Sequence, residues 1–326
     1  MSQLYPLKFE TIFKDKLWGG EKIRTVLNKD FGELPSCGET WEISGVKGNI
    51  SVVANGALKG KDLRALLAEY KGQLVGESVY NKFGDEFPLL VKFIDANDDL
   101  SVQVHPDDAL AKERHDSFGK TEMWYIFQAD EGATLNSGFN RPLTKETYLE
   151  YFNNGKLMDI LNVDDVKAND VYFLPAGRVH YIGKGCLLAE IQQTSDITYR
   201  IYDFDRTDAS GQKRELHTEE SLDAIDFSYH DNYKTDYQDK VNEVIELVSC
   251  QYFTTNKLHY DQKVVRDHSD LDSFVIYVCM EGALNLEYGE GALQIEKGEA
   301  VLVPASISNL TLEPQGEFKV LESFVR

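Results

Sequence analysis

Residues 169–180 read NDVYFLPAGRVH, and residues 298–309 read GEAVLVPASISN. Each stretch has an acidic residue, an apolar strand-like run, a Pro-Ala pair, and a polar residue five places after the proline. Upstream, YI followed by EGA within residues 125–133 is matched, in the same order, by YV followed by EGA within residues 277–283. These two ordered matches predict that the chain contains two related halves.

Short runs of β-branched and aromatic residues, separated by Gly, Asn and Asp, fill both halves and predict strands. The predicted strands span residues 41–44, 89–94, 101–104, 123–127, 171–174, 187–192, 198–202, 244–248, 274–279, 283–287 and 300–303. Helical periodicity is confined to residues 61–80, 106–114 and 145–153. The predicted fold is therefore mainly β, with two jelly rolls and a few short helical insertions in the N-terminal part.

A polar, acidic segment, residues 226–241, lacks strand periodicity and is predicted to link the two rolls. The alternative is that its tyrosines pack across a domain surface. The predicted domains are residues 1–235, which carry the chemistry, and residues 236–326, a C-terminal jelly roll.

The chain is strongly acidic, with 34 basic and 55 acidic residues and a net charge of -21. Such a field repels nucleic acid and anionic membrane surfaces, so neither is an expected partner. An anionic substrate would need a few basic residues placed locally to reverse the potential. No apolar run is long enough to span a membrane and no secretory signal is seen, so a cytoplasmic protein with four reduced, mostly buried cysteines is expected.

Three short stretches hold candidate metal ligands. Strand alternation places Gln103 and His105 on one face, Glu122 opens the next predicted strand, and the Pro-Ala-Gly turn presents His180. A lone strand histidine is more often a packed or exposed residue, and Glu122 alone would be an exposed charge. The combination of QxH with PxGxxH is a cupin-like layout, and its nitrogen and oxygen donors suit zinc or a similar divalent ion.

The second half lacks this ligand set. It has Ser306 and Asn309 where the first half has Gly177 and His180, and the rough alignment places Phe274 opposite Glu122. We therefore predict one metal site per chain.

Further along, Glu190 and Arg200 are ten residues apart, so alternation allows both to face one cavity. Arg200 offers a permanently charged, bidentate fork for oxyanions, and Lys120, two residues before Glu122, is a second nearby cation. The alternative for Arg200 is a surface salt bridge with Asp203 or Asp205.

Several longer motifs resemble one family, the type I phosphomannose isomerases, in their short bacterial form. The motifs are WGG at 18–20, ETWE at 39–42, PLLVK at 88–92, LSVQVHPDD at 100–108, GKTEMWY at 119–125, PAGRVH at 175–180 and SDITYRIYDFDR at 195–206. The resemblance is strong over the first two thirds of the chain. In the last third it rests only on the pattern of short predicted strands. It implies a cupin scaffold and a zinc-dependent interconversion of mannose 6-phosphate and fructose 6-phosphate.

The resemblance also implies residue roles. The implied zinc ligands are Gln103, His105, Glu122 and His180, the implied active-site arginine is Arg200, Ser101 and Lys120 match positions near the substrate, and Glu190 and Asp196 match acidic active-site groups. One departure is that longer members carry a His immediately before this Lys, where the present chain has Gly119. A ring-opening role for that His does not transfer.

Isomerisation through an enediol requires a base, an electrophile and a phosphate anchor. Zinc would polarise the substrate oxygens, Arg200 would stabilise the enediolate or bind phosphate, and Lys120 would hold phosphate. Glu190 is the predicted proton carrier, with a zinc-bound water as an equal rival. Two other functions stay open: a non-catalytic sugar-phosphate-binding cupin, and an Fe-dependent cupin oxygenase, which would not need Lys120 and Arg200. The oligomeric state, monomer or homodimer, is also open.

Overall fold

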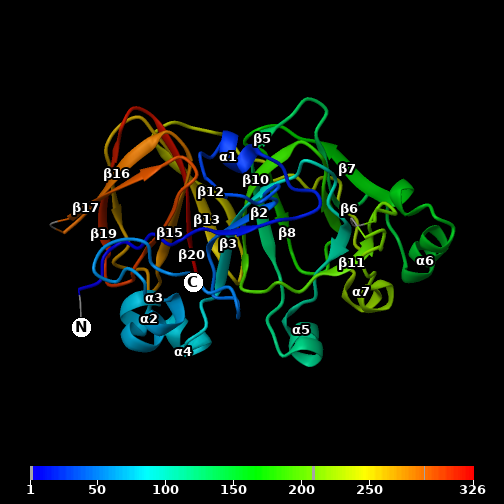
Figure 1. Ribbon diagram of the computed structural model, residues 1–326, viewed down its shortest axis with the longest axis horizontal. Helices are drawn as coiled ribbons and strands as arrows, with labels where there is room; N and C mark the ends of the chain where they lie inside the picture. Colours follow the sequence, from blue (N-terminus) through cyan, green and yellow to red (C-terminus); the bar gives the residue numbers. More distant parts are fainter. Residues whose placement is uncertain (1–2, 208–209, 290) are drawn as a thin grey trace.

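The structure is a computed structural model that describes residues 3–207, 210–289 and 291–326 (Figure 1). It is mainly β, as predicted, and its strands form two rolls of two sheets each. All eleven predicted strands are present, within about two residues of their predicted ends.

The first roll has a six-stranded and a five-stranded sheet. The six-stranded sheet has the order β1 (Ile12–Lys14), β2 (Glu39–Ile43), β3 (Leu89–Asp95), β10 (Cys186–Gln193), β5 (Glu122–Ala129) and β8 (Val171–Leu174). The five-stranded sheet has the order β11 (Tyr199–Tyr202), β4 (Val102–Val104), β9 (His180–Ile182), β6 (Thr134–Phe139) and β7 (Leu161–Asp165).

The second roll repeats this plan with five and four strands. Its larger sheet has the order β12 (Glu243–Ser249), β13 (Thr254–Tyr260), β20 (Phe318–Phe324), β15 (Val275–Glu281) and β18 (Ala300–Val303). Its smaller sheet has the order β14 (Val264–Asp267), β19 (Asn309–Pro314), β16 (Ala283–Tyr288) and β17 (Gly291–Glu296). Figure 1 shows this roll in yellow, orange and red beside the green and blue first roll.

The two rolls pack against each other through their larger sheets. One buried cluster contains Val91 of β3 and Ile191 of β10 together with Ile276 of β15 and Leu321 of β20. Each roll also has apolar clusters of its own, so the interior of the first roll is separate from this interface. The metal-ligand candidates lie in the first roll, away from the second.

The repeat seen in the sequence is real, but its register in one strand is one residue off. Trp124 lies inside the first roll, whereas Tyr125 faces the core between the rolls. Tyr277 lies inside the second roll, so it corresponds to Trp124 and not to Tyr125. The residue corresponding to Glu122 is therefore Val275, which offers no donor atom to a metal, and not Phe274. Such a shift is hard to see in the sequence because both faces of this strand are apolar. A one-residue slip moves each side chain to the other face without changing the apolar character of the run.

The predicted helix over residues 61–80 is broken into α2 (Leu63–Tyr70), α3 (Gly72–Val75) and α4 (Glu77–Phe83). The breaks fall at Lys71 and Gly76, which have φ angles of 50° and 95°. A Cβ on Gly76 would lie 2.2 Å from the carbonyl oxygen of Asp272 in the second roll, so this junction requires glycine.

The other predicted helices are α5 (Asp108–His115) and α6 (Lys145–Asn153). Three short helical segments were not predicted: α1 (Lys22–Thr25), η1 (Leu157–Ile160) and α7 (Thr218–Ala224). Each has seven residues or fewer, which is too short for a clear helical period.

The predicted linker runs as an irregular segment against the first roll. Tyr233 is buried, and its hydroxyl donates to the carbonyl of Phe139 at 2.9 Å, so this linker tyrosine packs, whereas Tyr229 is 40% exposed. The domain boundary at residues 235–236 lies between α7 and β12 and stays a prediction. No helix among the described residues is long and apolar enough to cross a membrane, and the cytoplasmic location also stays a prediction. The cysteines are free thiols, and three of the four are buried.

Candidate metal centre and cavity

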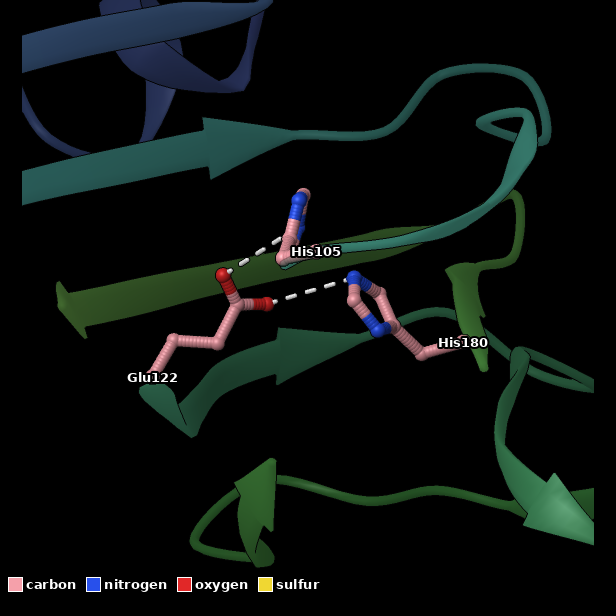
Figure 2. Close-up of side chains that lie close together, drawn as sticks. All are labelled: His105, Glu122 and His180. Carbon is pink, nitrogen blue, oxygen red and sulfur yellow. Dashed lines mark ion pairs between the residues drawn. The ribbon is translucent and has the colours of Figure 1, made fainter. Parts of the chain in front are cut away.

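His105, Glu122 and His180 converge inside the first roll, with all three ligand atoms within 4.8 Å of one another (Figure 2). Nε2 of His105 lies 3.5 Å from one carboxylate oxygen of Glu122, and Nε2 of His180 lies 3.4 Å from the other. Glu122 opens β5, His180 opens β9, and His105 directly follows β4. Three strands of both sheets therefore bring these side chains together.

The turn before His180 is fixed by a glycine. Gly177 has a φ of 89°, and a Cβ there would lie 2.8 Å from the carbonyl oxygen of Ala224 at the end of α7. The backbone N–H of Gly177 donates to the carbonyl of His105 at 2.9 Å, which ties the two histidine segments together. The PxGxxH motif thus positions the imidazole through its backbone.

In both histidines Nε2 is the unprotonated ring nitrogen. Nδ1 of His105 donates to the carbonyl of Ile197, and Nδ1 of His180 donates to the carbonyl of Arg178, each at 2.8 Å. A carbonyl can only accept, so the proton is on Nδ1, and Nε2 keeps the lone pair with which it can bind a metal. Burial lowers the pKa of His105 and lowers the pKa of His180 to about 3, which keeps both rings neutral.

Glu122 is fully buried, and neither of its oxygens has a hydrogen-bond partner among the described residues. Burial raises its pKa to about 7, and the charge of Lys120, whose Nζ lies 3.3 Å away, opposes this rise. A buried carboxylate whose oxygens accept no hydrogen bond is costly, and a single cation at 3.3 Å meets only one of the two oxygens. The residues therefore fit a divalent metal.

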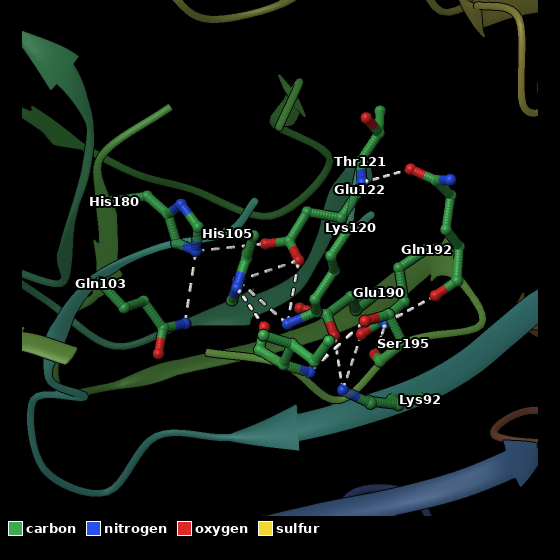
Figure 3. Close-up of polar contacts among 12 residues, drawn as sticks. Lys92, Gln103, His105, Lys120, Thr121, Glu122, His180, Glu190, Gln192 and Ser195 are labelled. Atoms are coloured by element: carbon green, nitrogen blue, oxygen red, sulfur yellow. Dashed lines mark hydrogen bonds and ion pairs between the residues drawn. The ribbon is translucent and has the colours of Figure 1, made fainter. Parts of the chain in front are cut away.

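Gln103 completes the predicted ligand set. It pairs with His180 across β4 and β9, and its amide Nε2 lies 3.3 Å from His180 Nε2 (Figure 3). A half-turn of the amide brings its oxygen, a ligand for Zn²⁺, to the same place. All four predicted ligands thus lie together, which the sequence spacing alone did not establish.

A cavity of about 320 Å³ borders this cluster. Six of the residues predicted to form the site line it: Ser101, Gln103, Lys120, Glu190, Asp196 and Arg200. Ser101, Lys120 and Glu190 are buried, whereas Asp196 is exposed. The proposed substrate residues and the proposed ligands therefore belong to one site.

Arg200 is not part of a surface salt bridge with Asp203 or Asp205. Its Nη1 donates to the carbonyl of Glu215 at 2.8 Å, whereas Asp203 pairs with Arg206 and Arg214. The guanidinium is instead part of the cavity wall.

No role was predicted for Lys92. It lies on β3, directly opposite Glu190 of β10 on one side and Trp41 of β2 on the other. Lys92 Nζ lies 3.0 Å from a Glu190 oxygen and donates to Gln192 at 2.7 Å (Figure 3). A signal was present, because Lys92 interrupts the apolar run PLLVKFI, where a buried lysine needs a partner.

Glu39 is the second missed residue of the cavity wall. Burial raises its pKa, but the charges of Lys92 and Lys16 and a hydrogen bond from Trp41 outweigh that effect and lower it to about 2. Its position at the start of a strand did not indicate that Glu39 lines the cavity as an ionised carboxylate.

The cavity reverses the overall charge of the chain. Its basic lining residues are Lys16, Lys92, Lys120, Arg200 and Arg214, and its acidic ones are Glu39, Glu190 and Asp196. A local excess of cations in a protein of net charge -21 concentrates small anions at this one place.

Two family models match the chain. Residues 6–126 match that of the type I phosphomannose isomerase catalytic domain, and residues 243–323 match that of the mannose-6-phosphate isomerase cupin domain. The mannose-6-phosphate isomerase ManA of Bacillus subtilis is 36% identical over 318 residues, covering 96% of this chain and 97% of that protein. The mannose-6-phosphate isomerase of Streptococcus mutans is 42% identical over 256 residues, covering 77% and 78%. The crystal structure of a mannose 6-phosphate isomerase from Bacillus subtilis superposes with a TM-score of 0.87 at 32% identity, covering 98% of this chain and 99% of that one.

Proposed function

The chain belongs to the type I phosphomannose isomerase family, and we propose that it is a zinc-dependent enzyme interconverting mannose 6-phosphate and fructose 6-phosphate. The observation that carries the proposal is the placement of a buried carboxylate without a hydrogen-bond partner and of two Nε2 lone pairs beside a cation-lined cavity. A sugar phosphate needs both features: a metal at the reacting carbons and positive charge for the phosphate.

The proposed metal ligands are Gln103, His105, Glu122 and His180. Neutral imidazole, carboxylate and amide oxygen form a borderline donor set that suits Zn²⁺. When bound, zinc polarises the carbonyl and hydroxyl oxygens at C1 and C2 of the sugar. The two histidine ligands are held by the backbone carbonyls of Ile197 and Arg178, so the orientation of both rings is set before a metal arrives.

The remaining residues bind and orient the substrate. Lys120 lies 3.0 Å from His105 Nε2, so its charge is next to the reacting end. Arg200 supplies a planar fork in the cavity wall for an oxyanion, and Ser101 and Asp196 supply hydroxyl and carboxylate contacts for the sugar.

Glu190 is proposed to carry the proton between C1 and C2. Burial raises its pKa, but the charges of Lys92 and Lys120 and hydrogen bonds from Lys92 and Trp124 outweigh burial and lower it. Glu190 is therefore ionised and able to accept a proton, while its pairing with Lys92 makes it a weak base.

The test is turnover of mannose 6-phosphate in a coupled assay, before and after chelation and after zinc is returned. We expect activity, its loss with chelator, and its recovery with zinc. Tight sugar-phosphate binding without turnover would instead indicate a binding cupin, and oxygen consumption restored by Fe²⁺ would indicate an oxygenase. Full activity in metal-free protein would contradict the zinc claim.

A further inference from the structure

Arg214 is not among the residues assigned to the proposed reaction, yet its side chain lines the cavity together with Arg200 and Lys120. It lies in the segment that joins β11 to α7, and its side chain is 26% exposed. Glu122, at the metal cluster, is 1% exposed. Arg214 therefore belongs to a part of the cavity wall that solvent reaches, whereas Glu122 is enclosed in the roll.

Asp203 holds the guanidinium of Arg214 by one edge. Nε of Arg214 donates to Oδ2 of Asp203 at 2.7 Å, and Nη2 donates to Oδ1. Asp203 is buried, and although burial raises its pKa, hydrogen bonds from Arg214 and Arg206 outweigh that effect and lower it. The ion pair fixes Arg214 in place, and among the described residues Nη1 has no hydrogen-bond acceptor. One edge of the fork is thus left for a ligand.

Arg200 has an unused donor as well. Its Nη1 is held by the carbonyl of Glu215, but its Nε is buried without a partner among the described residues. A buried N–H group without an acceptor is costly, and an oxyanion in the cavity would relieve that cost.

The two guanidinium groups are close enough to affect each other. Burial lowers the pKa of Arg200, and the charge of Arg214 is the next largest cause. Asp203 forms ion pairs with Arg214 and Arg206, whereas Arg200 forms no ion pair among the described residues, although the charges of Asp203 and Glu215 act on it. The cluster therefore carries surplus positive charge at the cavity wall.

We propose that Arg214 and Arg200 together clamp the phosphate group of the sugar phosphate, with Asp203 as the residue that positions Arg214. The inference rests on the proposed function, since it places the phosphate at the solvent-exposed part of the cavity wall and the reacting carbons at the metal. Lys120 lies beside the metal ligands, so in this arrangement it is not the phosphate anchor that the sequence led us to expect. A dianionic phosphate with three terminal oxygens matches two forks better than a single carboxylate does.

The experiment compares Arg214→Ala and Arg214→Lys with Arg206→Ala as the matched control. Arg206 pairs with the same Asp203 but does not line the cavity. Binding of inorganic phosphate is measured by calorimetry, and KM and kcat for mannose 6-phosphate are measured in parallel. We expect Arg214→Ala to raise the Kd for phosphate and the KM by about tenfold or more, with a smaller change in kcat. Arg214→Lys should fall between wild type and Arg214→Ala, because lysine keeps the charge but loses the fork.

Arg206→Ala should change both constants by less than about threefold. Wild-type phosphate affinity in Arg214→Ala would overturn the clamp, and so would an equal loss in Arg206→Ala. If the wild-type protein bound phosphate in an Arg214-dependent way but did not isomerise mannose 6-phosphate, the proposed function would fail while the clamp stood. If the protein isomerised mannose 6-phosphate but neither KM nor Kd depended on Arg214, the clamp would fail while the proposed function stood.

Discussion

Lys92 Nζ lies 3.0 Å from Glu190 Oε1, and the two residues face each other directly across β3 and β10. The other Glu190 oxygen accepts a hydrogen bond from the indole of Trp124 at 2.9 Å. Both members of the pair are buried, so each is the main compensation for the other's charge. The contribution of this pair to stability and the contribution of Glu190 to activity can be tested with different variants.

For stability, Lys92→Met should destabilise the protein by about 3–5 kcal/mol, because it leaves Glu190 as a buried charge without its main partner. The double variant Lys92→Met/Glu190→Leu should recover most of that loss, since neither charge then remains. Urea unfolding of the two variants and wild type measures the difference. A double variant no more stable than Lys92→Met would contradict the pairing argument.

For activity, Glu190→Gln should lower kcat by about 10²-fold or more while zinc content is unchanged, because an amide does not accept the proton. Metal analysis and the coupled isomerase assay on the same preparation test this. A wild-type kcat would leave Glu190 only its ion pair with Lys92.

The metal centre predicts that His180→Ala loses both zinc and turnover. Removing one of the ligands lowers metal affinity, and Lys120 is then the nearest cation to the buried carboxylate of Glu122. His268→Ala is the matched control, because His268 is a buried histidine of the second roll that contacts Tyr277. Metal content by mass spectrometry should fall only in His180→Ala. Equal zinc in both variants would remove His180 from the ligand set.

Arg200→Ala should keep zinc and lose turnover by at least about 10²-fold, since Arg200 lies in the cavity wall but contacts none of the metal ligands by any ion pair or hydrogen bond seen among the described residues. Loss of zinc in this variant would show that the arginine supports the fold of the metal centre, and a wild-type rate would remove it from the reaction.

Much of the fold could be predicted because its signal is local. Strands such as β8, at residues 171–174, carry their apolar texture and turn residues in the sequence itself. The break at Gly76 could not be predicted, because it depends on the carbonyl of Asp272, which is close in space and almost two hundred residues away in sequence. Helix periodicity carries no information about such a contact.

The site was predictable where spacing and residue type coincide, as for His105 and His180. Lys92 and Arg214 were missed for different reasons. Lys92 acts through cross-strand register with Glu190, and Arg214 through a long connection that returns to the cavity. Neither relation is visible until the strands are paired.

Gly119, which precedes Lys120, is in a place where the structure allows only a small residue. A Cβ there would lie 2.6 Å from the backbone of both Asp107 and Asp108 at the start of α5. Gly119→Ala should therefore destabilise the protein by about 1–3 kcal/mol, as overpacking does. Thermal unfolding measures the loss. Ala109→Gly, at an exposed position in the first turn of α5, is the comparison. A Gly119→Ala variant with wild-type stability would show that the start of α5 moves to accommodate the methyl group without loss of unfolding free energy.

The second roll predicts a pH dependence of its own. Glu322 of β20 is fully buried and accepts hydrogen bonds from Arg266 at 2.9 and 2.7 Å and from Tyr277 at 2.8 Å. Burial alone raises its pKa, but hydrogen bonds from His268 and Arg266 and the charge of Arg266 outweigh burial and lower it to about 2, from a usual value of 4.5. A lowered carboxyl pKa stabilises the fold above pH 4.5, and this contribution is lost as the pH falls from about 4.5 to about 2.

Glu322→Gln should therefore be less stable than wild type at pH 7 by about 3 kcal/mol, and the gap should narrow as the pH is lowered from 5 to 3. Denaturant unfolding at a series of pH values measures the gap. Glu33→Gln, a substitution at an exposed position, should follow the wild-type curve throughout. A gap between Glu322→Gln and wild type that stayed constant with pH would mean that Glu322 does not titrate in this range. The buried network would then stabilise the roll through packing and not through its charge.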